Sequence, residues 1–311
     1  MAKKILIALI TILTLSSFGG YFYFKNMFKA PPNLITVNGS STEVNITWTN
    51  SENSDRAGMF VPVKIKGLPE NLYMQFDMGA VYSLLYNKPL SDLAEKYNIQ
   101  ANTNFIESFE VELNEMTVHF DSIKNINYGK PINWDDKEKK IIIGTLGADF
   151  LERVKSVINF KESKLSFYQT TPDLVNGKDL HDFQFEERRI MIDMALDGET
   201  KTLMWDTGAS AYNLITSESN YNTLASKPLN EQVEDANQLK RKLKVYTAAS
   251  DKKFILGDQS LDIKSVTYVD GFPWYIKVMY YFSPMEGMVG NNLFRDKSIY
   301  IDPANEKFLL L

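Results

Sequence analysis

The sequence predicts an all-β protein of two similar lobes with few short helices, preceded by a transmembrane helix. Short segments of alternating apolar and polar residues, each ending at turn-forming residues, run through most of the chain. Two blocks of sequence each occur twice, and residues 5–24 form a predominantly apolar run. We therefore expect a β-rich folded part that repeats one unit and follows an apolar N-terminal helix.

Polar stretches rich in turn formers divide the chain into its predicted parts. In chain order these are a membrane anchor or signal segment at 1–28, a stalk or linker at 29–56, a first lobe at 57–170, a linker at 171–186 and a second lobe at 187–311. An added edge strand is the alternative interpretation of the stalk.

The apolar run is long enough to span a membrane. At about 1.5 Å per residue, a helix over 5–24 reaches about 30 Å, the thickness of a bilayer's hydrocarbon core. A cleaved signal peptide is the competing interpretation, but no clear small-x-small cleavage site follows, and the aromatic residues at 21–24 resemble an interfacial belt. We expect a single-pass membrane protein whose folded part lies outside the cytoplasm. After signal cleavage it would be secreted or periplasmic.

Composition narrows the possible chemistry. The chain of 311 residues has no cysteine, 2 histidines and a formal net charge of −5. A disulfide framework, a thiol nucleophile and a thiolate metal site are excluded, and His119 and His181 stand in no triad or zinc pattern. No metal, nucleotide or haem signature is visible, so we expect no cofactor. The basic cluster at 239–244 alternates as a half-exposed strand does, so we expect no nucleic-acid partner.

The predicted strands and short helices follow in order within each copy. In the first copy we expect strands at 60–68, 109–120, 156–160 and 164–168, with helices at 89–98 and 147–154. In the second copy we expect strands at 188–196, 242–249, 254–271 and 298–311, with helices at 219–227 and 290–297.

Two acidic turns occupy matching positions in the repeat. The aligned blocks are 72–86 with 201–215, and 146–168 with 289–311. The first alignment places Asp77 on Asp206 and Gly79 on Gly208. Asp followed closely by Gly is by itself an ordinary turn sequence. Its repetition in two copies of one unit is what suggests chemistry.

The repeated pattern is an apolar strand ending in an Asp-Thr-Gly-Ala sequence and, many residues later, an apolar-apolar-Gly sequence before a short helix and a hairpin. It is clearest in "WDTGAS" at 205–210 and "MVGNNLF" at 288–294. This pattern resembles the aspartic proteases of the pepsin and retropepsin type, including bacterial aspartyl protease domains. The resemblance covers roughly residues 57–311 and implies a pepsin-like bilobal double β-barrel with pseudo-twofold symmetry.

The resemblance implies an aspartic-type endopeptidase that acts on a peptide or protein substrate through a dyad of Asp77 and Asp206. Two adjacent carboxyl groups cannot both ionise cheaply, so one keeps its proton while the other stays charged. In the family the charged member activates a water molecule and the protonated member hydrogen-bonds the substrate carbonyl oxygen. The residues implied to support the dyad are Met78, Gly79, Ala80, Thr207, Gly208, Ala209 and Ser210.

The first copy departs from the family pattern. In the family a Thr or Ser after each Asp braces the opposite turn; Thr207 fits this pattern and Met78 does not. Ser210 is positioned to donate its hydroxyl to Asp206, whereas the matching residue of the first copy offers Asp77 nothing. We therefore expect Asp206 to ionise more readily and Asp77 to keep the proton.

These departures also fit a catalytically inactive pepsin-like module that binds peptides or partners in the cell envelope, or an envelope structural domain that uses its sheet edges. For an enzyme, the resemblance implies a flap hairpin in the first copy between 100 and 128. The aromatic stretch at 271–282 is a candidate wall of a pocket for apolar side chains.

Overall fold

The computed structural model describes residues 29–69, 71–98, 104–136, 138–227, 229, 231–238, 241–273 and 285–311. The apolar run at 5–24 and most of the aromatic stretch at 271–282 lie outside these residues, so the membrane anchor and the pocket wall stay predictions. Within the described part of the chain, no helix combines the length and the apolar character needed to cross a membrane.

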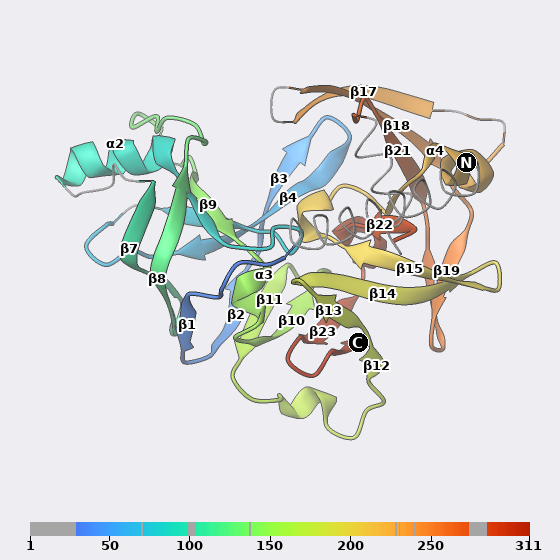
Figure 1. Cartoon of the computed structure of the whole chain (residues 1–311), viewed down its shortest axis with the longest axis horizontal. Helices are drawn as coiled ribbons and strands as arrows, with labels where there is room; N and C mark the ends of the chain where they lie inside the picture. Colours follow the sequence, from blue (N-terminus) through green and yellow to red (C-terminus); the bar gives the residue numbers. More distant parts are fainter. Residues whose placement is uncertain are drawn as a thin grey trace, which may run out of the picture. The chain divides into compact units, whose positions relative to one another are not determined.

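Strands make up most of the regular structure, which confirms the all-β class with few short helices. Residues Asn33–Leu311 form one compact unit. Its described strands lie in three sheets, none of which closes into a barrel (Figure 1).

The first sheet has the strand order β1-β8-β6-β9-β5-β4-β3, with β7 also paired to β8. Its strands are β1 (Ile35–Asn38), β3 (Thr47–Ser51), β4 (Ser54–Val63), β5 (Leu72–Phe76), β6 (Leu84–Tyr86), β7 (Phe105–Leu113), β8 (Met116–Ile126) and β9 (Ile141–Leu146).

A second sheet is built from the second copy in the order β17-β18-β21-β16-β22-β15-β14-β19-β20, with β13 paired to β14. Its strands are β13 (Gln184–Glu186), β14 (Arg189–Leu196), β15 (Glu199–Trp205), β16 (Leu214–Thr216), β17 (Glu231–Gln238), β18 (Arg241–Ala249), β19 (Lys253–Leu256), β20 (Gln259–Asp262), β21 (Ser265–Asp270) and β22 (Gly287–Val289).

The sequence repeat is also a repeat of topology. In the first sheet β5 runs parallel to β9, while β6 runs parallel to β8 and antiparallel to β9. In the second sheet β15 runs parallel to β22, while β16 runs parallel to β21 and antiparallel to β22. The order β8-β6-β9-β5-β4 therefore matches β21-β16-β22-β15-β14. The two acidic turns follow equivalent strands, β5 and β15.

The third sheet joins the two copies. Its order is β12-β24-β23-β10-β11-β2, and the central antiparallel pair, β10 with β23, takes one strand from each copy (Figure 1). Its strands are β2 (Ser41–Asn45), β10 (Lys155–Asn159), β11 (Lys164–Tyr168), β12 (His181–Asp182), β23 (Ser298–Asp302) and β24 (Lys307–Leu310). The copies thus share backbone hydrogen bonds as well as side-chain contacts.

The stalk or linker predicted at 29–56 is corrected by this pairing. β1 pairs with β8, β2 with β11 and β3 with β4, so residues 35–51 supply edge strands to two sheets, as in the alternative interpretation. The linker predicted at 171–186 also ends in paired strands, because β12 pairs with β24 and β13 with β14. Edge strands need few apolar residues, which is why these polar segments did not resemble strands.

The helices predicted from the sequence lie close to their expected positions, as α2 (Asn87–Tyr97), α3 (Ala148–Leu151), α4 (Glu218–Leu224) and the 3₁₀ turn η3 (Asn291–Phe294). The 3₁₀ turns η1 (Asp173–Val175) and η2 (Thr207–Ala209) were not predicted. α3 and η3 follow Gly147 and Gly290, the matching glycines of the second repeated block. Helix α2 ends at Asn98, which has the left-handed φ of 53° typical of a helix C-terminus.

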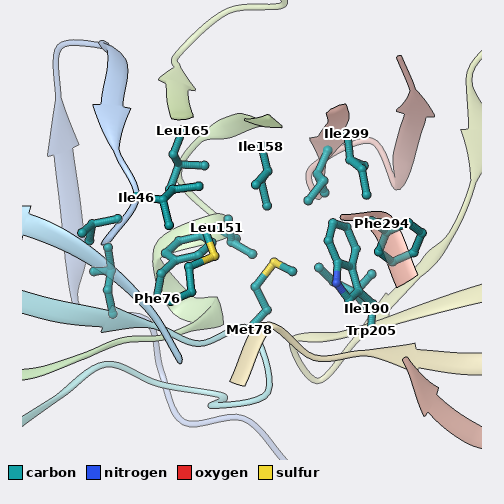
Figure 2. Close-up of a cluster of buried hydrophobic side chains, with 14 of the residues drawn as sticks. Ile46, Phe76, Met78, Leu151, Ile158, Leu165, Ile190, Trp205, Phe294 and Ile299 are labelled. Atoms are coloured by element: carbon teal, nitrogen blue, oxygen red, sulfur yellow. The ribbon is translucent and has the colours of Figure 1, made fainter. Parts of the chain in front are cut away.

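A hydrophobic core runs continuously beneath both acidic turns. Phe76 and Trp205, the last residues of β5 and β15, are fully buried, and so is Met78. Figure 2 shows the Met78 side chain in this cluster between Phe76 and Trp205. The Trp205 ring lies 5.0 Å from that of Phe294 and 6.3 Å from that of Phe160, between ring centroids. The turns therefore rest on a packed apolar base drawn from both copies.

Candidate active site

The two acidic turns are built in the same way. In β5 the residues Leu72, Met74 and Phe76 point into the core, and the strand ends directly before Asp77. The Asp77 amide donates to the carbonyl oxygen of Leu146 at 3.1 Å, and the Asp206 amide donates to that of Val289 at 2.9 Å. Each aspartate is thus fixed by the last backbone hydrogen bond of a parallel strand pair.

Each carboxylate folds back onto its own turn. The Gly79 amide donates to Asp77 Oδ1 at 3.0 Å, and the Gly208 amide donates to Asp206 Oδ1 at 2.7 Å. Asp side chains accept such bonds two residues ahead in many turns. The main chain therefore fixes both side-chain rotamers before any substrate is present.

The two turns meet face to face, and both aspartates are half-buried. A Cβ atom added at Gly208 would lie 2.6 Å from Asp77 Oδ1, and one added at Gly79 would collide with the carboxyl group of Asp206. Each carboxyl group thus packs on the glycine of the opposite turn, and a hydrogen bond joins Asp77 to Asp206. Only a residue without a side chain allows this approach.

The proton between them belongs mainly to Asp206. Burial first, and then the charge of Asp77, raises the pKa of Asp206 to about 7. Burial also raises the pKa of Asp77, but the hydrogen bond from Asp206 acts against that rise. Since the two groups titrate as a pair, one proton is held across the acidic range.

This distribution corrects the expected one. We expected Ser210 to stabilise the charge on Asp206, but its hydroxyl donates to the carbonyl oxygen of Thr207 at 2.5 Å. The hydrogen bonds that lower the pKa of Asp77 against the effect of burial come first from Asp206 and then from the amides of Gly79 and Ala80. Asp77 is therefore the member that ionises more readily, and Asp206 the member that keeps the proton.

The brace between the turns is one-sided. Thr207 Oγ1 accepts a hydrogen bond from the Met78 amide at 2.8 Å and donates one to the carbonyl oxygen of Phe76 at 2.9 Å. Thr207 is fully buried. Met78 has no hydroxyl to return these bonds and places its side chain in the apolar core instead. The second copy thus holds the first through Thr207, as the family pattern implies for that residue.

A buried asparagine, which the sequence reasoning missed, supports the second turn. Asn291 Nδ2 donates to Ser210 Oγ at 2.7 Å and to the Thr207 carbonyl oxygen at 3.3 Å, and its Oδ1 accepts from Trp205 Nε1 at 3.3 Å. The only sequence signal was a polar residue directly after Gly290, where the first copy has Ala148.

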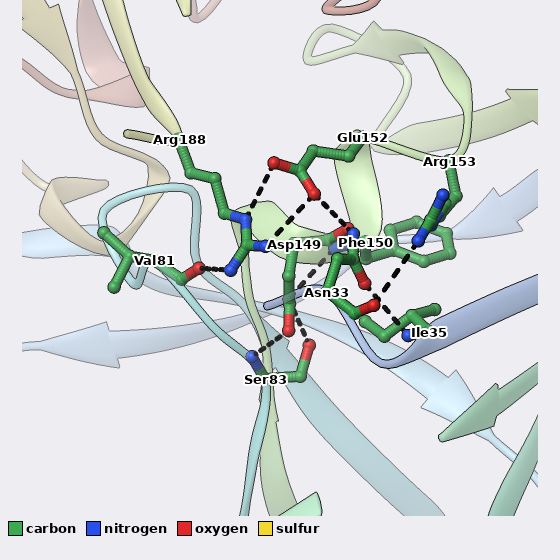
Figure 3. Close-up of polar contacts among 9 residues, drawn as sticks. All are labelled: Asn33, Ile35, Val81, Ser83, Asp149, Phe150, Glu152, Arg153 and Arg188. Carbon is green, nitrogen blue, oxygen red and sulfur yellow. Dashed lines mark hydrogen bonds and ion pairs between the residues drawn. The ribbon is translucent and has the colours of Figure 1, made fainter. Parts of the chain in front are cut away.

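The first copy supports its turn with a carboxylate instead. Asp149 is buried and accepts hydrogen bonds from the amide and the hydroxyl of Ser83, both at 2.7 Å (Figure 3). Burial raises the pKa of Asp149. Ser83 Oγ in turn accepts from the Gly147 amide at 3.0 Å. The loop that follows Asp77 is therefore anchored to the start of α3.

Arg188 ties the second copy to this same loop, another contact that the sequence reasoning missed. Its guanidinium group donates to Glu152 through Nε at 2.9 Å and Nη2 at 3.1 Å, and through Nη1 to the carbonyl oxygen of Val81 at 3.1 Å (Figure 3). The side chain is 4% exposed. Arg188 precedes β14, so its bidentate pair with Glu152 links β14 to the end of α3, and its bond to Val81 links β14 to the loop that follows Asp77.

The hairpin predicted as a flap is present, but its turn does not lie over the two carboxyl groups. β7 and β8 form a hairpin whose turn, Asn114 and Glu115, packs against Gly39, in the turn between β1 and β2, and against Thr42 in β2. The opposite end of β8 is the one that pairs with β6. The turn of this hairpin therefore does not cover the two carboxyl groups.

A cavity of about 730 Å³ lies beside Asp77 on the first-copy side. Gln75, whose amide contacts Asp77, lines it together with Phe60 and Tyr86. The Tyr86 hydroxyl group is hydrogen-bonded to Thr145 Oγ1 at 2.7 Å, and burial raises the pKa of this phenol. Asp77 does not itself line the cavity, and Gln75 is the lining residue that contacts it.

Within the described residues, no cluster of three or more His, Cys, Asp or Glu side chains is arranged to hold a metal ion. No protein-family model matches the chain, and no curated protein is significantly similar to it in sequence. The geometry of the two aspartates and the sequence pattern are therefore the indications of function.

Proposed function

We propose that the chain is an aspartic-type endopeptidase with a pepsin-like bilobal fold, and that Asp77 and Asp206 form its catalytic dyad. The observation that carries this proposal is the reciprocal packing of each carboxyl group on the glycine of the opposite turn, with a hydrogen bond between the two. Matching strand orders around the two turns support a pseudo-twofold relation between the copies.

In this proposal the two carboxyl groups divide the chemistry of peptide hydrolysis. Ionised Asp77 accepts a proton from a water molecule held between the two groups, and the water oxygen bonds to the carbonyl carbon of the substrate. Protonated Asp206 donates a hydrogen bond to the carbonyl oxygen as negative charge develops on it. Asp77 then passes its proton to the amide nitrogen, the C–N bond breaks, and the acid and amine products leave.

The pKa shifts define the pH range of this mechanism. Above about pH 7 the Asp206 proton is lost, so the acid is absent and cleavage falls. At sufficiently low pH Asp77 is also protonated, so the base is absent. Activity should therefore be bell-shaped, with its falling alkaline limb near pH 7.

We further propose that the enzyme is anchored in a membrane through residues 5–24, with its folded part outside the cytoplasm. The apolar run and its flanking lysines support this location. Release by signal cleavage would give a secreted or periplasmic enzyme instead.

A catalytically inactive module that binds peptides or envelope partners is the second candidate function. Met78 favours it, because the Thr207 brace has no counterpart from the first copy. A one-sided brace would position the dyad less rigidly, which matters more for catalysis than for binding.

Cleavage of a denatured protein distinguishes the two functions. The purified full chain in detergent would be incubated with reduced, unfolded casein between about pH 3 and pH 8, with and without a statine-type inhibitor. We expect inhibitor-sensitive cleavage that is lost in Asp77→Asn and in Asp206→Asn. The exposed Asp258→Asn is the matched control and should cleave like the wild type. Absence of cleavage by folded wild-type protein at every pH would overturn the proposal.

A further inference from the structure

The cavity beside Asp77 has a preformed wall. Residues 128–134 form this wall, anchored to α2 by the Ile132 amide, which donates to Asp92 Oδ2 at 2.6 Å, and by the Lys88 amide, which donates to the Tyr128 carbonyl oxygen at 3.1 Å. The rings of Tyr86 and Tyr128 meet edge to face with centroids 4.9 Å apart. Because this wall is already ordered, little conformational entropy is lost in ordering it when a ligand binds.

The same wall is basic in a chain of net negative charge. Four lysines line the cavity against a single acidic residue, Asp136. Lys130, Lys139 and Lys140 are exposed and, among the described residues, make no ion pair. The remaining lysine, Lys96, places its Nζ 3.7 Å from the centroid of the Trp134 ring. Asp135 and Glu138 belong to the same loop but do not line the cavity.

Aromatic surface accompanies the lysines. Tyr128 is 59% exposed and Trp134 is 38% exposed, and both line the cavity. An apolar wall with a cationic rim is suited to a short apolar stem that ends in a carboxylate, since the stem packs on the rings while the carboxylate faces the ammonium groups. Glutamate and aspartate side chains have this form.

We propose that this cavity, here called the basic pocket (Gln75, Tyr86, Lys96, Tyr128, Lys130, Trp134, Lys139 and Lys140), binds an acidic side chain of the substrate peptide next to the dyad. The inference rests on the proposed function in taking a peptide as the ligand, and it adds the class of peptide. The dyad then receives peptide bonds that lie close to a glutamate or aspartate.

A binding assay tests the pocket without requiring cleavage. The probes are fluorescein-labelled decapeptides of one neutral sequence in which a single internal Glu is replaced by Gln or Lys, each with an amidated C-terminus. Their Kd values would be measured by fluorescence anisotropy on the full-chain Asp206→Asn variant in detergent at about pH 6. We expect the Glu peptide to bind about fivefold tighter than the Gln peptide, and the Lys peptide to bind weakest.

Two double-lysine variants distinguish binding in the basic pocket from a general effect of the protein's positive charges. In Lys139→Gln/Lys140→Gln the preference for Glu should fall to less than about twofold. In Lys161→Gln/Lys178→Gln, which removes the same charge from exposed lysines outside the pocket, it should stay near fivefold. A carboxylate ligand could also come from the C-terminus of a peptide. A neutral peptide with a free C-terminal carboxylate tests this source, and we expect it to bind no tighter than the same peptide with an amidated C-terminus.

Three results would overturn the inference: equal affinity for the Glu and Gln peptides, equal loss of preference in both double variants, or a preference for the free C-terminus over an internal Glu. Cleavage is read separately with the wild-type chain. A Glu preference without cleavage keeps the pocket and rejects the enzyme, while cleavage without a Glu preference keeps the enzyme and rejects the pocket.

Discussion

The Thr207→Val substitution isolates the brace between the two acidic turns. Valine keeps the shape of threonine and removes only the hydroxyl group, which is fully buried and bonded twice to the first copy. The amide of Met78 and the carbonyl oxygen of Phe76 would then lose their partner. Neither gains access to water, because the surrounding side chains belong to the packed core.

The expected cost follows from these two groups. A buried polar group left without its partner costs about 1–3 kcal/mol, so two of them cost about 3 kcal/mol at the lower half of that range. For a folded body of this size, that loss lowers the melting temperature by roughly 6 °C. Because the brace also sets the separation of the carboxyl groups, cleavage should fall about tenfold or more.

Thermal unfolding followed by circular dichroism at about pH 5 measures the cost, with kcat/KM on an unfolded protein substrate measured beside it. Thr207→Ser is the matched control, since it keeps the hydroxyl and loses one methyl group. We expect the serine variant to unfold within about 2 °C of the wild type. If valine and serine variants unfold at the same temperature, Thr207 does not brace the turns and the reasoning is refuted.

Further predictions concern the glycines, the link through Arg188 and the shared proton. Gly208→Ala should lower kcat/KM about a hundredfold by pushing the Asp77 carboxylate aside, whereas Gly67→Ala, in open space at a φ of 85°, should lower only the stability. Arg188→Met should cost about 2–3 kcal/mol in urea unfolding, and adding Glu152→Met should restore part of that loss; an unchanged midpoint for the single variant would contradict the link. Since the folded-state pKa of Asp206 is raised to about 7 from 3.8, the folded chain binds more protons than the unfolded chain between these values, and stability must fall as pH rises through this window. The Asp206→Asn variant should therefore melt above the wild type at about pH 8 and lose this pH dependence; a wild-type stability that rises through the window would contradict the raised pKa.

The duplicated architecture could be predicted because the same sequence pattern occurs twice in the chain. Two copies of one unit with the same apolar alternation must pack in the same way, so matching Asp77 to Asp206 also matched the strands that end before them. The short helices α3 and η3 were predictable for a related reason, since each directly follows the matching glycine of a repeated block. The local pattern of apolar and polar residues is sufficient to predict a strand or helix when one face of that element is buried.

The edge strands and the polar supports could not be predicted in the same way. Residues 35–51 are mostly polar and are recognisable as strands only from their partners β8, β11 and β4. Arg188 and Asn291 act across the fold, and no local spacing marks a residue whose partner lies far along the chain. The proton assignment was wrong because the Ser210 hydroxyl bonds to the Thr207 carbonyl oxygen and not to Asp206, and because the burial that raises the pKa of Asp206 depends on the whole fold.

The central claim is that Asp77 and Asp206 share one proton, and carbon-13 NMR tests it most directly. The full chain would be labelled at the aspartate side-chain carboxyl carbons and titrated from about pH 3 to about pH 9, with signals assigned through Asp77→Asn and Asp206→Asn. We predict that both signals shift together in a step near pH 7, and that Asp206 titrates at lower pH once Asp77 is replaced. Two independent titrations near the ordinary value of 3.8, unaffected by either replacement, would contradict the claim.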